Sequence, residues 1–226
     1  MEMLHIMPSW FLSANILFEF LFFIFAAAIS YYAFSAYKLT NQRESKIFGW
    51  SFLFLAISHF ALIIINSLFL SITQGGFRTL EFGDLMGIKN FMVASYVFFF
   101  ILGLITITYM SLKIKSKKTY FLLIFLSIII LFCSMTLSLL IYSLASLLLL
   151  FITMYYFSEF IRTRNKNTLF VLIGFFMLLV TNLLLSIVTR YSLPSVYVLA
   201  YLTEVVGYTL IILSLINVLN YGKKKK

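Results

Sequence analysis

Charged residues are scarce in this 226-residue chain: Asp, Glu, Lys and Arg together make up 11% of it, while apolar residue types make up 63%. Soluble domains have about 25% charged and about 45–50% apolar residues. A chain of this composition cannot bury its apolar side chains in a water-soluble core, so it is predicted to be an integral membrane protein. The longest polar stretch between apolar segments is residues 74–90, which is too short to form a soluble domain.

Cysteine and proline are also rare, with one and two residues respectively. A single cysteine, Cys133, excludes an internal disulfide and a CxxC redox pair. Pro8 and Pro194 both lie at predicted helix starts, so proline interrupts none of the predicted spans. Secondary transporters often build their binding sites from helices broken by Gly or Pro, and that feature is missing from this sequence.

The sequence is instead dominated by long apolar segments. A helical span needs about 20 mostly apolar residues, and seven segments satisfy this, near residues 11–37, 47–73, 91–112, 119–137, 138–160, 167–190 and 195–221. As one helix, the uncharged run 119–158 would be about 60 Å long, twice the thickness of a bilayer core, so it must fold back near 133–138. The predicted fold class is all-α: one domain, 1–226, of seven transmembrane helices.

The distribution of Lys and Arg predicts the orientation of this domain. All but three of the 17 basic residues lie in the links after the first, third and fifth spans or in the C-terminal tail; the exceptions are Arg78, Lys89 and Arg190. The positive-inside rule then places the N-terminus on the outer side and the C-terminus on the inner side of the cell membrane. The net charge of +10 is therefore expected to contact anionic lipid headgroups at the inner face rather than nucleic acid.

Three ionisable residues, Glu19, His59 and Glu204, lie inside predicted spans. A charge at the bilayer centre costs from about 2.5 to more than 10 kcal/mol, so such residues face the protein interior and find partners there. At about 1.5 Å of rise per residue, all three lie about 12–13 Å below the outer surface. Spans one, two and seven are neighbours if the bundle closes in chain order, so the three side chains are predicted to meet.

Four more polar residues are expected near this layer because of their depth or their spacing from the three ionisable residues. The predicted site is an outward-facing polar pocket lined by Glu19, His59, Asn182 and Glu204, with Asn15, Asn66 and Tyr208 around it.

The polar layer is open to four interpretations. It could be hydrogen bonding that holds helices together, at about 0.6–2 kcal/mol per contact, or a path for protons or a cation. It could also bind a small organic or lipid ligand. A metal site would use Glu19, His59 and Glu204, ligand types that suit Zn or Mn. No nucleophile–base pair, phosphate loop or cofactor motif is recognisable, so neither enzymatic activity nor a bound cofactor is expected.

Two stretches carry a family resemblance: PSWFLSANILFEFLFFIFAAAISYYAFSAYKLT (8–40) and EVVGYTL (204–210). They resemble a group of uncharacterised archaeal seven-span membrane proteins, and the resemblance implies the fold but no activity. The topology is also similar to that of microbial rhodopsins, but the last span lacks the lysine that would hold retinal.

Two classes of function therefore remain open. The first is a non-enzymatic sensor, scaffold or accessory subunit that acts through a membrane protein partner. The second is a small transporter or channel for protons, a cation or a small polar solute, which would use the Glu/His layer.

Overall fold

The computed structural model describes residues 9–73, 82–113, 116–134, 138–191 and 193–224. Within these ranges the chain forms seven helices: α2 (Ser9–Thr40), α3 (Arg43–Thr73), α4 (Phe82–Ser111), α5 (Lys117–Ser134), α6 (Ser138–Thr163), α7 (Lys166–Tyr191) and α8 (Pro194–Lys224). Among the described residues, six helices are long and apolar enough to cross a membrane: α2, α3, α4, α6, α7 and α8. The prediction of an all-helical, multi-pass membrane protein is therefore confirmed.

Helix α4 begins earlier than the sequence suggested. Residues 82–90 lie between the predicted spans 47–73 and 91–112, in a stretch expected to be a connector or a loop with a short helix, and they form the first turns of α4. This segment has no proline and contains several apolar residues, so nothing in it prevents the helix of the following span from continuing backwards.

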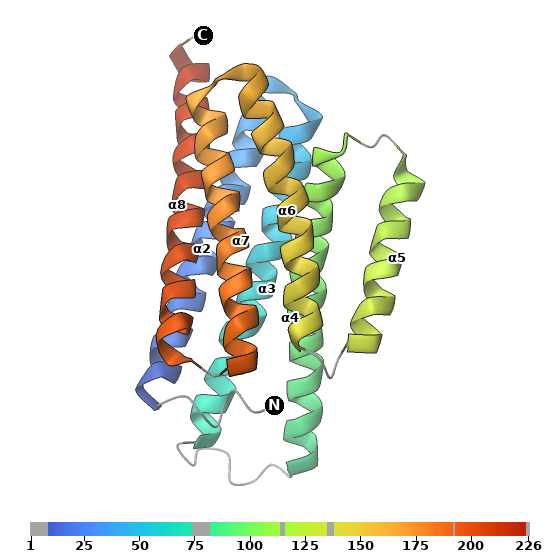
Figure 1. Cartoon of the computed structure of the whole chain (residues 1–226), viewed down its shortest axis with the longest axis vertical. Helices are drawn as coiled ribbons and strands as arrows, with labels where there is room; N and C mark the ends of the chain where they lie inside the picture. Colours follow the sequence, from blue (N-terminus) through green and yellow to red (C-terminus); the bar gives the residue numbers. More distant parts are fainter. Residues whose placement is uncertain (1–8, 74–81, 114–115, 135–137, 192, 225–226) are drawn as a thin grey trace.

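The helices alternate in direction, so α2, α4, α6 and α8 all end at the same end of the bundle, which is at the top of Figure 1. This end is called the basic end below, because Lys38, Arg43, Lys113 and Arg162 are among the basic residues near it. Three helices finish there in the same way. Asn41, Lys113 and Arg164 adopt the left-handed conformation, with φ of 55°, 51° and 52°, which is a common way to terminate a helix.

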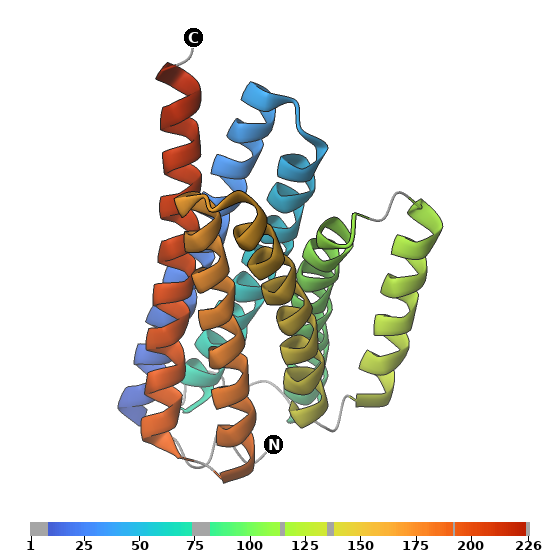
Figure 2. The same cartoon turned by 45° about the horizontal axis from the view of Figure 1, so that its top comes forward.

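Six of the helices close into a ring in the order α2, α3, α4, α6, α7, α8, with α8 packed against α2. Helix α5 lies outside this ring; it packs mainly on α4 and stands apart in both views (Figures 1 and 2). The Thr106 Oγ1 and Tyr120 OH atoms, 2.9 Å apart, join α4 to α5.

The expectation that the bundle closes in chain order holds for α2, α3 and α8 but is wrong for α5. Helix α4 packs directly against α6, so α5 is not a member of the ring. Helix α4 is the most enclosed of the six candidate spans, because α3, α5 and α6 all pack on it. In an 18-residue apolar stretch of α4, 56% is buried inside the protein, the largest share among these spans.

Helices α7 and α8 approach each other closely at Gly174 and Gly207. A Cβ atom added at Gly174 would lie 2.9 Å from the Gly207 carbonyl oxygen, and one added at Gly207 would lie 3.0 Å from the Gly174 carbonyl oxygen. Small residues allow helix backbones in membranes to come this close. The crossing fixes α8 against α7, and thereby sets which face of α8 points to the interior.

Candidate functional site

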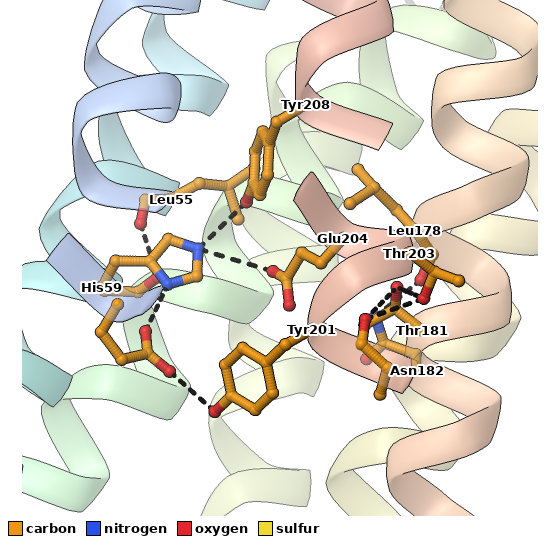
Figure 3. A network of polar contacts seen from close by, with 12 residues as sticks. Leu55, His59, Leu178, Thr181, Asn182, Tyr201, Thr203, Glu204 and Tyr208 are labelled. Atoms are coloured by element: carbon orange, nitrogen blue, oxygen red, sulfur yellow. Dashed lines mark hydrogen bonds and ion pairs between the residues drawn. The ribbon is translucent and has the colours of Figure 1, made fainter. Parts of the chain in front are cut away.

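The structure brings His59, Glu19 and Tyr208 together at the junction of α2, α3 and α8. The His59 Nδ1 atom lies 2.8 Å from Glu19 Oε2, and Nε2 lies 3.0 Å from the Tyr208 hydroxyl. The imidazole therefore contacts α2 with one nitrogen and α8 with the other (Figure 3). The Nδ1–H group donates to the carboxylate, which fixes the orientation of the ring.

The second carboxylate oxygen of Glu19 extends the network along α8. It accepts a hydrogen bond from the Tyr201 hydroxyl at 3.1 Å. The Tyr201 hydroxyl in turn lies 2.8 Å from that of Tyr197. A continuous chain of polar groups thus runs from Tyr197, near the start of α8, through Glu19 and His59 to Tyr208.

Tyr197 and Tyr201 are part of the network although the sequence analysis did not identify them. Together with Glu204 and Tyr208 they occupy positions i, i+4, i+7 and i+11 of α8, which lie on one face of a helix. This spacing of polar residues in an otherwise apolar span was the available signal. It gives α8 a polar stripe that faces α2 and α3.

The network is enclosed by aromatic rings. His59, Glu19 and Tyr208 are buried, with exposed fractions of 4%, 3% and 1%. The Phe22 ring stacks on that of Tyr201, with centroids 5.5 Å apart, and also contacts His59 and Tyr208. Buried charges without partners are very unfavourable, so the pairing of Glu19 with His59 is what allows both groups to lie here.

Glu204 belongs to the cluster but is held differently. Its Oε1 atom is 3.9 Å from His59 Nε2, too far for a hydrogen bond. Its side chain is 13% exposed, compared with 5% for His59 and 4% for Glu19. Tyr96 of α4 and Tyr142 of α6 are close enough to both glutamates to interact with them electrostatically. Groups from five helices therefore surround Glu204.

The other predicted pocket residues lie outside this network. Asn182 is buried on α7, where its amide donates to the Leu178 carbonyl oxygen at 3.0 Å. In Figure 3 it lies beside Thr181 and Thr203, which join α7 to α8 through hydroxyl groups 2.9 Å apart. Asn182 therefore lies beside the α7–α8 contact and bonds within α7 rather than to the His59 network.

Asn15 and Asn66 are likewise not part of the chain of contacts around His59. Asn15 is 8% exposed on α2, and its Oδ1 atom is buried without a hydrogen-bond partner in the described part of the protein. Asn66 on α3 is partly exposed. The predicted pocket is thus replaced by a compact, buried cluster of Glu19, His59, Glu204 and tyrosine hydroxyls.

The arrangement of the cluster does not support a three-ligand metal site. In the ranges that the structure describes, no group of three or more His, Cys, Asp or Glu side chains is placed to hold a metal ion. The reason is the direct contact between His59 and Glu19: at 2.8 Å, the Nδ1 atom and the carboxylate oxygen bond to each other rather than leaving room for an ion between them.

Comparisons with known protein families, with curated protein sequences and with solved structures found no match for this chain. The resemblances to archaeal seven-span proteins and to rhodopsins are therefore neither confirmed nor refuted.

Proposed function

We propose that this protein is a non-enzymatic membrane protein that works as a sensor or accessory subunit through a membrane protein partner. The observation that carries the proposal is the internal hydrogen bonding of the His59 network. Both ring nitrogens and both oxygens of Glu19 are engaged by groups of the same chain. Such a network couples α2, α3 and α8 mechanically, which suits a protein whose helices respond as a unit.

The packing next to the network also supports this role. On the side toward the basic end, Tyr208 contacts the rings of Phe22 and Phe52, and Phe52 contacts Phe175. Phe22, Phe52 and Phe175 are each 0% exposed. This aromatic layer separates the polar network from the basic end, whereas a transporter needs a path that opens to both sides.

Capture of a partner tests the proposal. The protein would be released gently from its native membrane and its mass measured under native conditions, beside the His59→Ala variant. We expect a complex with a second membrane protein that weakens in the variant, because the coupling between α2, α3 and α8 is lost. A chain that stays without a partner protein in its native membrane would contradict the proposal.

We further propose that all seven helices cross the cell membrane, with the N-terminus outside and the basic end inside against anionic lipid headgroups. Support comes from the basic residues at one end of the bundle. Asn165 and Ser195 are exposed at opposite ends. In a Cys133→Ser background, Ser195→Cys should react with an impermeant maleimide in intact cells and Asn165→Cys should not. The reverse pattern would invert the topology.

A proton pathway is the second candidate, and the hydrogen-bonded chain from Tyr197 to Tyr208 favours it. Hydroxyl, carboxylate and imidazole groups in contact can pass protons along a membrane protein. In liposomes, this function predicts a proton flux that Glu19→Gln abolishes and Glu159→Gln, at the exposed pair with Arg162, leaves intact. Liposomes that show no flux with the wild-type protein would remove this candidate.

A further inference from the structure

The two buried glutamates of the cluster differ in their hydrogen bonding. Glu19 has a partner on each oxygen, His59 at 2.8 Å and Tyr201 at 3.1 Å. Glu204 makes no hydrogen bond with the described residues, and its Oε1 atom lies 3.9 Å from His59 Nε2. Hydrogen bonds to a carboxylate stabilise its charged form. Within the described residues, the Glu19 carboxylate therefore has a hydrogen bond on each oxygen and Glu204 has none.

The net charge of the cluster also distinguishes Glu204 from Glu19. When His59 carries a proton on both ring nitrogens, it forms a neutral pair with the Glu19 carboxylate in direct contact. An ionised Glu204 would add one uncompensated negative charge inside the membrane, where charges are costly. A single proton on the Glu204 carboxyl group removes that charge, so the cluster has a place for one proton beyond the Glu19–His59 pair.

The groups that face Glu204 come from every neighbouring helix with a titratable side chain in the cluster. They are Glu19 of α2, His59 of α3, Tyr96 of α4, Tyr142 of α6, and Tyr197, Tyr201 and Tyr208 of α8. On α7, the nearby polar groups in Figure 3 are Thr181 and Asn182. His59 supplies the only basic side chain in this set, so a second positive charge must come from solution.

Access to Glu204 is also asymmetric. Its side chain is about three times as exposed as those of Glu19 and His59 (13% against 4% and 5%). Toward the basic end, the rings of Phe22, Phe52 and Phe175 block the approach. Toward the opposite end, the hydroxyl groups of Tyr201 and Tyr197 continue from the neighbouring Glu19 carboxylate to the start of α8.

We propose that Glu204 is a proton-binding site that equilibrates with the side of the membrane opposite the basic end, while Glu19 and His59 remain a fixed ion pair. Binding transfers one proton from water to a carboxylate oxygen, which forms one O–H bond and changes no oxidation state. This inference rests on the function proposed above, because it names the stimulus that the sensor detects. That stimulus is the acidity of the outer side.

Infrared difference spectroscopy during a pH titration of the purified full-length protein tests this site. The wild-type protein should show one carbonyl band of a buried protonated carboxylic acid that disappears as the pH is raised. Glu204→Gln should abolish the band, and Glu159→Gln should leave it unchanged because Glu159 lies at the exposed pair with Arg162. A band that persists in Glu204→Gln, or that is absent from the wild type, would overturn the proposal.

Two further measurements keep the test decisive. If Glu204→Gln does not give monodisperse protein, Glu204→Asp must shift the frequency of the band, and an unshifted band would refute the assignment. In sealed vesicles of known orientation, acidifying the side opposite the basic end should produce the band. A band that forms only when the basic side is acidified would refute the sidedness.

The outcomes also separate this inference from the proposed function. If no partner protein is captured but the carbonyl band of Glu204 titrates, the role through a partner is rejected and the proton site is kept. If a partner complex is found but no carbonyl band appears, the proton site is rejected and the role through a partner is kept.

Discussion

Substitution of Glu19 by alanine should destabilise the bundle more than any change to a neutral polar contact. The substitution removes the acceptor that lies 2.8 Å from His59 Nδ1. It also removes the acceptor 3.1 Å from the Tyr201 hydroxyl, which keeps only the Tyr197 hydroxyl as a partner. Breaking a buried ion pair by removing one partner costs about 3–5 kcal/mol. We expect the free energy of unfolding to fall by that amount, because α2 loses the Glu19 contacts to His59 of α3 and Tyr201 of α8.

A double-mutant cycle with His59→Ala isolates the pair itself. Hydrogen bonds to charged groups contribute about 1.5–3 kcal/mol, whereas interhelical hydrogen bonds in a membrane protein average about 0.6 kcal/mol. The coupling free energy between Glu19 and His59 should therefore fall in the higher range. Ser30→Ala is the matched control, because the Ser30 hydroxyl donates to the Gly49 carbonyl oxygen at 2.9 Å and joins the same two helices without a charge.

Reversible unfolding in mixed micelles, with the fraction of a denaturing detergent raised stepwise and helicity followed by circular dichroism, measures these free energies. Gel filtration of each variant before the titration confirms that it starts folded. A coupling free energy no larger than the loss caused by Ser30→Ala would show that the Glu19–His59 contact is a neutral hydrogen bond. That result would refute the fixed ion pair on which the assignment of the mobile proton to Glu204 depends.

Three further substitutions test the packing. Gly174→Ala should lower the free energy of unfolding by about 1–3 kcal/mol through overpacking, since the added Cβ would lie 2.6 Å from Ile211 and 2.9 Å from the Gly207 carbonyl oxygen. Equal unfolding curves for this variant and the wild type would contradict the α7–α8 crossing. Arg164→Gly should raise the melting temperature relative to Arg164→Ala, because a residue with a Cβ in the left-handed conformation costs about 1 kcal/mol. A lower melting temperature for the glycine variant would contradict the left-handed end of α6. Arg162→Ala should change the unfolding free energy by less than about 1 kcal/mol, as its side chain is 68% exposed; a larger loss in the same detergent titration would mean that the pair is shielded from water.

The order and nature of the helices could be predicted from sequence because the membrane imposes them. A span must be helical so that its backbone groups bond to one another, and its length follows from the thickness of the bilayer. The return of the chain between α5 and α6 followed from the same length argument. The start of α4 at Phe82 could not be predicted, because a helix can continue past the apolar part of its span.

The candidate site was predictable in depth but not in detail. The positions of Glu19, His59 and Glu204 along their spans put them in one layer, and the structure places them within contact of one another. Asn182 has a similar predicted depth but lies at the α7–α8 contact. Depth follows from counting residues, whereas inclusion in the network depends on the rotation of each helix about its axis.

The composition and the spacing of charges were enough to predict a multi-pass helical membrane protein with its basic residues gathered at one end and three ionisable groups at one depth. The packing of the helices shows that α5 lies outside the ring, that Tyr197 and Tyr201 face inward, and that Glu19 hydrogen-bonds His59 whereas Glu204 approaches it only to 3.9 Å. The physical reason is that lipid and protein interior are both apolar. The apolar pattern of a membrane helix therefore does not distinguish its lipid-facing side from its buried side, and only the packing of the helices against one another sets that choice.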